Sequence, residues 1–387
     1  MLPPIVLLLP YLKNEYGNAG TIYGLGRRAA DAIANARKQV AGLINAEPEQ
    51  IIFTSGGSEA NSLVFHGLCR RLMQSGKKHI IVSATEHDSV LKAAEALRNP
   101  LCCNNEKCTK DEFDIQYLSV DKYGVVSTDE LQKMLTDDVG LVSVMYVNNE
   151  TGSVNPVKEI GRVCAEHNIL FHTDCVQAAG CHPIDVSNIE CDFLSLSSHK
   201  IHGAKGVGAL FAKRKELLSP IIYGGHSQEF GVRGGTENVA GIVGFGTACE
   251  LAILGREDYG NTVYFYKKEF YRRLISALNT YGMKDVVKVN GAPGHTKGRT
   301  LNLRFAGVDG ETLLLMLDAR GVCVSAGSAC RSHESEPSHV LMAMGLSPDE
   351  ARDSIRVSFS EFNQPLDIDN AAKIFADCIR VLKGGVA

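Results

Sequence analysis

The chain lacks a strong excess of charge and a long apolar segment near its start. Its 387 residues carry a formal net charge of -4 and have a pI near 6.3, which argues against nucleic acid or an anionic membrane as an obligate partner. The apolar stretch from Leu2 to Leu9 contains prolines, follows no basic segment and is too short to span a bilayer. We therefore expect a soluble enzyme without a membrane partner, located in the cytoplasm or, as an open alternative, in an organelle.

The chain also lacks a cysteine cluster with the spacing of a metal site. It has 12 cysteines, and most are scattered through segments that we expect to be strands or helices, where buried reduced thiols are the simplest interpretation. Those are Cys69, Cys164, Cys191, Cys249 and Cys378. Cys102, Cys103 and Cys108 do lie together, but no histidine or fourth cysteine stands beside them at zinc-finger spacing. We expect a surface loop there and no metal.

No internal repeat, low-complexity stretch or Ser/Pro-rich spacer separates the parts of the chain. From residue 15 to about residue 254, strand and helix patterns alternate as βαβ units require, which predicts a mostly parallel α/β sheet. After Gly255 the pattern changes to an amphipathic helix over 258–278, followed by short strands and helices. We predict a large cofactor-binding domain over 15–254 and a smaller α+β domain over 255–387, which residues 1–14 join.

A lysine stands just after a short apolar segment in the middle of the chain. The segment from Asp192 to Leu196 predicts a core strand, and Lys200 follows it in Ser197-Ser198-His199-Lys200. Open α/β sheets bind ligands at the carboxyl ends of their strands. A partly desolvated amine there can form a Schiff base with an aldehyde cofactor. Taken alone, the motif also fits an exposed loop.

Four other predicted strands end in polar residues. The strand at 51–54 runs into Ser55-Gly56-Gly57-Ser58 and then a helix-compatible segment. Glycine backbone, a helix N-terminus and the Ser58 hydroxyl together suit a phosphate group. The strands at 79–83, 141–147 and 169–174 lead to His87, Asn149 and Asp174, with Gln177 just beyond. Each residue could be an ordinary cap or turn, but the set in this order predicts one binding site.

At these residues the chain resembles the pyridoxal-phosphate-dependent cysteine desulfurases and the related selenocysteine lyases of the class V aminotransferase group. The resemblance extends from about Tyr11 to Val381. Its motifs are Thr54-Ser55-Gly56-Gly57-Ser58-Glu59-Ala60-Asn61, Thr85-Glu86-His87, Asn148-Asn149-Glu150-Thr151-Gly152, His172-Thr173-Asp174, Ser197-Ser198-His199-Lys200, Arg233-Gly234-Gly235-Thr236-Glu237-Asn238 and Ser325-Ala326-Gly327-Ser328-Ala329-Cys330. It implies the type I fold of pyridoxal-phosphate enzymes, pyridoxal 5'-phosphate as cofactor and a homodimer.

The resemblance also implies a role for each matching residue. Lys200 corresponds to the lysine that holds the cofactor, Asp174 to the carboxylate at its pyridine nitrogen, and His87 to the imidazole on its ring. The expected phosphate ligands are Gly57, Ser58, Ser197 and His199, with Thr236 from the other subunit, and the expected ring contacts are Asn149 and Gln177. Arg356 is similar to the arginine that binds the substrate carboxylate, and a guanidinium fork suits that group. A surface arginine is the alternative.

Cys330 lies in a run of small and polar residues, 325–337, that lacks apolar periodicity and predicts a mobile loop. Arg331 and His333 favour the thiolate, so Cys330 fits a nucleophile, although an incidental exposed cysteine is the alternative. By the resemblance, Cys330 takes sulfur from L-cysteine as a persulfide and leaves alanine. The sulfur then passes to an acceptor such as an iron-sulfur scaffold protein.

Two other functions stay open at this point. A selenocysteine lyase acting on selenocysteine is similar at Thr85-Glu86-His87-Asp88-Ser89-Val90, whereas Glu336-Pro337-Ser338-His339-Val340-Leu341 looks more like the desulfurases. A non-catalytic relative that binds sulfur-transfer partners is the second. It gains support because family members have Asp-x-x-Ala-Thr-Thr before the region matching Pro10, where this chain has apolar residues. We interpret the chain as a cysteine desulfurase.

Overall fold

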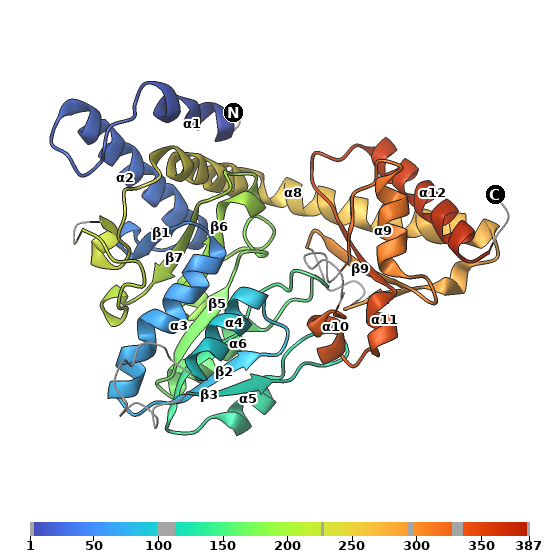
Figure 1. The fold of residues 1–387 in the computed structure, drawn as a ribbon, viewed down its shortest axis with the longest axis horizontal. Helices are drawn as coiled ribbons and strands as arrows, with labels where there is room; N and C mark the ends of the chain where they lie inside the picture. The colour runs from blue at the N-terminus through green and yellow to red at the C-terminus, as the bar shows by residue number, and fades with distance from the viewer. Residues whose placement is uncertain (1–3, 99–112, 226–227, 293–297, 327–335, 385–387) are drawn as a thin grey trace. The chain divides into compact units, whose positions relative to one another are not determined.

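The computed structural model describes residues 4–98, 113–225, 228–292, 298–326 and 336–384. The chain forms two compact units (Figure 1). The first unit comprises Met1–Leu118, Ser127–Tyr146 and Asn155–Arg256, and the second comprises Ser119–Val126, Val147–Val154 and Glu257–Ala387. Residues 1–14 therefore group with the first unit, whereas the sequence analysis joined them to the smaller domain. Two short segments from the first half of the chain group with the second unit.

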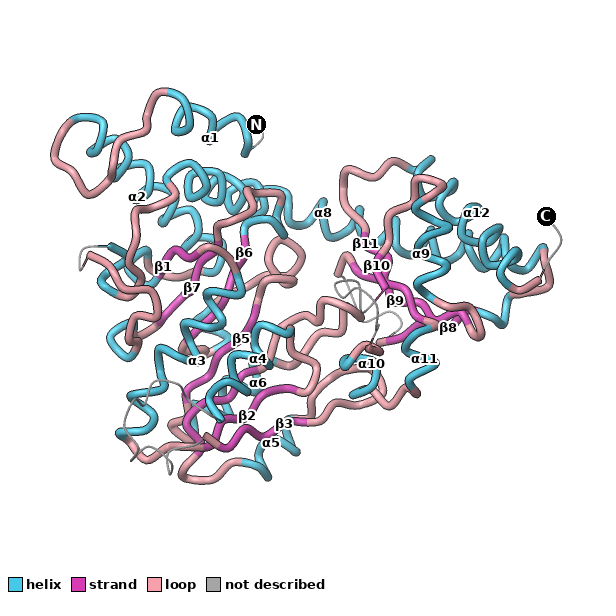
Figure 2. Tube along the Cα trace, viewed as in Figure 1, coloured by secondary structure: helices cyan, strands magenta, loops and turns pink. Residues whose placement is uncertain are grey.

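A seven-stranded sheet with the order β1-β7-β6-β5-β4-β2-β3 forms the centre of the first unit (Figure 2). Its strands are β1 (Ile51–Thr54), β2 (His79–Ser83), β3 (Asp114–Leu118), β4 (Val139–Ser143), β5 (Leu170–Asp174), β6 (Phe193–Ser197) and β7 (Gly208–Ala212). All neighbours from β6 to β3 are parallel, and only β7 runs antiparallel to β6 and β1. The predicted mostly parallel sheet is confirmed, and its parallel strands bring their carboxyl ends to one edge.

The strand predicted over 141–147 is shorter at its carboxyl end than expected. Regular pairing of β4 with β5 stops at Ser143. Beyond it, the amides of Val144 and Tyr146 still donate to carbonyls of β5, at 3.1 and 3.0 Å. Regular pairing thus stops two residues before the end of β5 at Asp174, and after Tyr146 the chain enters the segment Val147–Val154 of the second unit. Asn149 therefore does not stand directly at a strand end.

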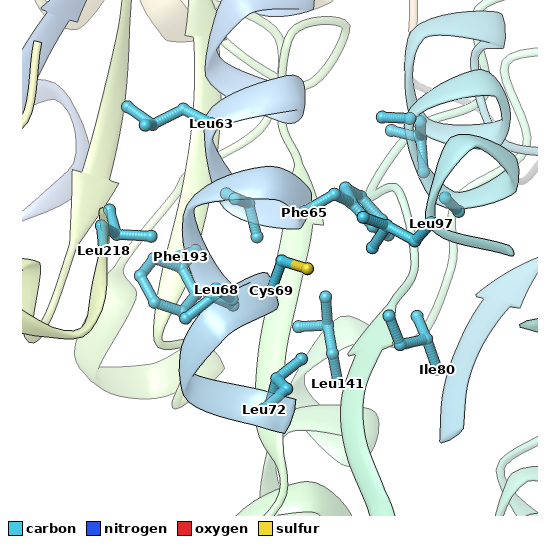
Figure 3. Close-up of a cluster of buried hydrophobic side chains, with 14 of the residues drawn as sticks. Leu63, Phe65, Leu68, Cys69, Leu72, Ile80, Leu97, Leu141, Phe193 and Leu218 are labelled. Carbon is cyan, nitrogen blue, oxygen red and sulfur yellow. The ribbon is translucent and has the colours of Figure 1, made fainter. Parts of the chain in front are cut away.

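The first unit is held together by apolar side chains between helices and sheet. Its helices include α1 (Pro4–Lys13), α2 (Gly24–Ile44), α3 (Gly57–Gln74), α4 (Asp88–Glu95), α5 (Thr128–Met134), α6 (Val157–Glu166) and α7 (Val186–Ile189). Along α3, Leu68 and Leu72 repeat at helical spacing and pack against Leu141 of β4 and Phe193 of β6 (Figure 3). Burial of each such side chain contributes about 1.5–3 kcal/mol, which holds α3 against the sheet.

The second unit has its own antiparallel sheet and core. Its strands, in the order β10-β11-β9-β8, are β8 (Val287–Asn290), β9 (Thr300–Phe305), β10 (Ser325–Ala326) and β11 (Ser354–Ser358). Its helices include α9 (Gly310–Asp318), α10 (His339–Ala343), α11 (Pro348–Arg352) and α12 (Pro365–Leu382). Phe270 and Phe375 are fully buried and pack edge to face, with ring centroids 5.3 Å apart. The predicted smaller C-terminal α+β part is confirmed.

One helix contributes to both units. The helix predicted at 258–278 exists, but α8 (Val239–Thr280) already begins at Val239 and has 42 residues. It is long and apolar enough to cross a membrane by length and composition, yet half of its most apolar window is buried inside the protein. Ile242, Phe245 and Cys249 of its first half are core residues. We therefore treat α8 as a core helix of a folded protein.

Candidate active site

The turn between β1 and α3 has the features of an anion cradle. A Cβ atom on Gly57 would lie 2.8 Å from Cγ2 of Val176 and 3.7 Å from Cβ of Ser197, so only glycine fits there without a shift. α3 begins at Gly57 and no side chain caps its first amides. Those amides and the positive end of the helix suit a phosphate group. Ser58 is exposed at the same turn.

The residues after β6 lie beside that turn. Ser197 is the last residue of β6, is buried, and its Oγ lies 2.9 Å from Nδ1 of His199. A short 3-10 helix, η3 (Ser198–Ile201), then carries His199, which is exposed, and Lys200, which is half-buried. Because Gly57 packs against Ser197, the two predicted phosphate-binding segments meet at one place.

Asp174 is a buried carboxyl group at the end of β5, with an exposed fraction of 4%. Its Oδ1 accepts from the Val176 amide and its Oδ2 from Nδ2 of Asn61, both at 2.9 Å. Burial raises the pKa of the Asp174 carboxyl, whereas these hydrogen bonds and the positive charges of His87 and Lys200 act to lower it. A ligand that brings its own positive charge would therefore favour the carboxylate.

A hydrogen-bonded chain joins His87 to Asp174. His87 caps α4, and its Nδ1 accepts from the amide of Ser89 at 3.1 Å and lies 2.8 Å from the Ser89 hydroxyl. Ser89 Oγ in turn accepts from Nδ2 of Asn61 at 2.8 Å. The sequence analysis assigned no role to Ser89 or Asn61. The sequence could have indicated Asn61, because it lies four residues after Gly57 and a helix places two residues with this spacing on the same face.

The loop that contains Thr236 is tied to the start of α3 by a charged pair. Nε of Arg233 lies 2.9 Å from Oε1 of Glu59, and Oε2 of Glu59 accepts from the Ser55 amide at 2.8 Å. Burial acts to raise the pKa of Glu59, but the hydrogen bonds from Arg233 and Ser55 outweigh it and the pKa is lowered. Thr236 itself is exposed. Gln177 lies in a turn after β5 and is half-buried.

The second unit brings together Asn149 and Arg356. Nη1 of Arg356, on β11, donates to the backbone oxygen of Asn149 at 3.2 Å. Burial lowers the pKa of the Arg356 guanidinium, and the negative charge of Glu150 opposes that effect. Nε of Arg356 and Oδ1 of Asn149 are shielded from water and have no hydrogen-bond partner among the described residues. Buried polar atoms in this state indicate a place where a ligand can bind.

Several predicted residues lie outside the part of the chain that the structure describes. They are Cys330 with its neighbours Arg331 and His333, and the group Cys102, Cys103 and Cys108. The described cysteines that were predicted to be buried reduced thiols are buried and form no disulfide: Cys69, Cys164, Cys191, Cys249 and Cys378.

Comparisons with known proteins find relatives of this chain in both sequence and structure. The family model for class-V aminotransferases matches residues 4–371. A cysteine desulfurase IscS of Methanosarcina thermophila is 39% identical over 376 residues, with 97% of this chain and 88% of that protein covered. A putative cysteine desulfurase IscS 1 of Bacillus subtilis (strain 168) is 42% identical over 376 residues, with 97% and 94% covered. A solved NifS-like protein superposes with a TM-score of 0.85 at 29% identity, with 98% of this chain and 96% of that chain covered.

Proposed function

The chain belongs to the class-V aminotransferase family, and we propose that within it the protein is a cysteine desulfurase that uses pyridoxal 5'-phosphate. It converts L-cysteine to L-alanine and passes the sulfur on as a protein persulfide. The observation that carries the proposal is the buried Asp174 carboxyl at the end of β5, which Asn61 links through Ser89 to His87. The same unit holds the uncapped start of α3 next to Ser197.

The residues of the first unit fit the cofactor. The cradle at Gly57 and Ser58, with Ser197 and His199 beside it, suits the phosphate, and Thr236 of the neighbouring subunit in a homodimer completes it. Asp174 would face the pyridine nitrogen, His87 the ring and Gln177 its polar edge, while Lys200 would supply the amine that holds the aldehyde carbon. When bound, the cofactor supplies an electron sink that makes the Cα proton of the amino acid acidic.

The remaining steps are carried out by the side chains of this chain. Arg356 binds the substrate carboxylate through its guanidinium fork. Lys200 holds and moves the proton at Cα. The Cys330 thiolate attacks the substrate sulfur, so an S–S bond forms while the Cβ–S bond breaks, and its electron pair stays on the carbon that becomes the methyl group of alanine. Because Cys330 keeps the sulfur, the acceptor need not reach the cofactor.

The acceptor and the compartment are part of the same proposal. In this proposal the acceptor is a sulfur-carrying protein such as an iron-sulfur scaffold. Location in the cytoplasm is supported by the thiols, since no disulfide joins the described cysteines and a reducing compartment keeps disulfides from forming.

The test uses the purified holoenzyme with L-cysteine. We expect alanine in a stoichiometry of one per sulfur transferred, and after one turnover a sulfur adduct on the peptide that contains Cys330. Cys330→Ala should keep the cofactor absorbance and lose alanine formation. Cys323→Ala is the matched control, because Cys323 is an exposed free thiol of the same unit.

Three outcomes would contradict the proposal. An adduct on another cysteine would refute the role of Cys330. A Cys330→Ala variant that still releases selenide from selenocysteine, beside a wild type that turns over selenocysteine faster than cysteine, would indicate a lyase. A cofactor-loaded wild type that acts on neither amino acid would indicate a non-catalytic relative.

A further inference from the structure

A buried carboxylate of the second unit has no part in the mechanism above. Glu150 follows Asn149 directly and has an exposed fraction of 7%. Its Oε2 accepts a hydrogen bond of 2.5 Å from the hydroxyl of Ser338. Ser338, exposed to only 6%, also caps α10, where its Oγ accepts from the Leu341 amide at 3.2 Å. Burying a carboxylate destabilises the fold unless the carboxylate is hydrogen-bonded and lies near an opposite charge. The position of Glu150 therefore needs an explanation.

The backbone of Glu150 is held by the sheet that carries Arg356. Nδ2 of Asn302 donates to the Glu150 carbonyl at 3.3 Å, and Oδ1 of Asn302 accepts from Asn290 at 2.8 Å. Asn302, on β9, is the direct cross-strand partner of Arg356 on β11. Glu150 is thus fixed at its side chain by Ser338 and at its backbone by the strand next to Arg356.

Arg356 depends on this arrangement in two ways. Its guanidinium is largely desolvated, which disfavours the charged form, and Glu150 supplies an opposing negative charge. Its Nη1 is also bonded to the carbonyl of Asn149, the residue next to Glu150 in the chain. A change in the position of Glu150 therefore alters both the charge balance of Arg356 and the carbonyl that orients its fork.

We propose that Glu150, held by Ser338, is a positioning residue that fixes Arg356 and Asn149 to receive the carboxylate of the amino-acid substrate. The inference rests on the proposed function, in which Arg356 binds that carboxylate. Glu150 itself does not contact the substrate. If Glu150 has this role, then replacing Glu150 or Ser338 should weaken the binding of ligands that have a carboxylate group and leave the binding of other ligands unchanged.

The experiment titrates the holoenzyme with two amines and follows the cofactor absorbance. L-Alanine has a carboxylate group and ethylamine lacks one. Glu150→Gln, which removes the charge, and Ser338→Ala, which removes the hydrogen bond, should each weaken L-alanine about tenfold, a free-energy change of about 1.4 kcal/mol. Neither should change the affinity for ethylamine. For L-cysteine the same variants should raise KM by a similar factor with a much smaller change in kcat.

Two further variants separate positioning from simple loss of a helix cap. Ser347→Ala removes the N-cap of α11, in which Ser347 Oγ accepts from the Glu350 amide at 3.3 Å, and it should lower the melting temperature without affecting L-alanine binding. Ser338→Thr keeps a hydroxyl group and should restore affinity.

Unchanged L-alanine binding in both Glu150→Gln and Ser338→Ala would overturn the inference, and so would equal weakening of both amines. A wild-type holoenzyme that does not turn over L-cysteine would instead contradict the proposed function.

Discussion

The two units assemble their polar residues in different ways. In the first unit, the candidate residues lie at or shortly after strand ends, as Asp174 does on β5 and Ser197 on β6. In the second unit, the contacts join distant segments: Arg356 and Asn149 are 207 positions apart, and Ser338 and Glu150 are 188 apart. Parallel strands bring successive carboxyl ends to one edge, so nearness in the first unit follows from the strand pattern. Nearness in the second unit depends on how its sheet packs against the segment Val147–Val154.

This difference indicates a division of work. The strand-end residues of the first unit are the ones proposed to hold the cofactor and move protons, while the network of the second unit is proposed to hold the substrate carboxylate. Changes in the first group should therefore affect chemistry and cofactor retention, whereas changes in the second should affect substrate affinity. The following predictions test that separation.

The largest effect is expected at Lys200. Lys200→Ala removes the amine that is proposed to join the cofactor and move the Cα proton, so kcat should fall by about 10²–10⁴. The melting temperature should change little, because Lys200 is only half-buried in η3. Borohydride should label the wild-type peptide that contains Lys200. Lys205→Ala, at an exposed position nearby, is the control. A label on Lys205, or near-normal alanine formation by Lys200→Ala, would refute the assignment.

Replacement of Glu229 tests whether a long-range contact in the first unit contributes to the stability of the protein and not to its activity. Glu229 and Arg37 form a largely buried pair with two hydrogen bonds of 2.7 and 2.8 Å, and Glu229 also accepts from the Phe53 amide at 2.7 Å. Glu229→Ala should lower the free energy of unfolding by about 3–5 kcal/mol, because it leaves a buried charge unpaired.

Chemical denaturation measures the effect of Glu229→Ala. Arg28→Ala breaks an exposed pair with Glu15 and should cost at most about 1 kcal/mol. A Glu229→Ala enzyme that is as stable as the wild type but has a much lower kcat would contradict the prediction that this contact matters for stability alone.

Acid should destabilise the first unit through His172. This ring is fully buried between the hydroxyls of Ser143 and Ser195, at 2.8 and 3.0 Å. Burial lowers the pKa of His172 from its ordinary 6.5 to about 3. The unfolded chain therefore takes up a proton that the folded chain does not. The resulting stability is fully present above pH 6.5 and is lost as the pH falls from 6.5 towards 3, by up to about 1.4 kcal/mol per pH unit.

Urea unfolding between pH 7 and pH 4 should show this slope in the wild type and a flatter one in His172→Gln. Equal slopes in the two proteins would show that His172 does not carry the effect.

The smallest effects are expected at two buried asparagines, one in each unit, which can be compared directly. Asn61 and Asn302 are both buried and both hydrogen-bonded, Asn61 to Asp174 in the first unit and Asn302 to the Glu150 carbonyl in the second. Replacement of either by alanine leaves a buried acceptor without its donor and should cost about 1–3 kcal/mol of stability. Asn61→Ala should also speed loss of the cofactor in dialysis, whereas Asn302→Ala should raise KM for L-cysteine. The reverse assignment, or the same defect in both, would contradict the division of work.

Much of the first unit could be predicted from the sequence. The strands β1, β2, β5 and β6 begin and end within one residue of their predicted positions, because short apolar runs bounded by glycine and polar residues are local signals. The prediction was wrong at the end of β4, where the chain leaves the sheet for the segment Val147–Val154 of the second unit. The contact of Asn61 with Ser89 and Asp174 was also missed, since it depends on how α3 and α4 pack.

The sequence by itself determined the alternation of strands and helices, the placement of Gly57, Asp174 and Ser197 along one sheet edge, and the smaller α+β part. These follow from side-chain periodicity and from the geometry of parallel strands, which neighbouring residues specify. Only the tertiary structure decided that the segment Val147–Val154 belongs to the second unit and that Glu150 bonds to Ser338. Such contacts close chain loops of more than a hundred residues, and their free energy depends on packing that no local pattern records.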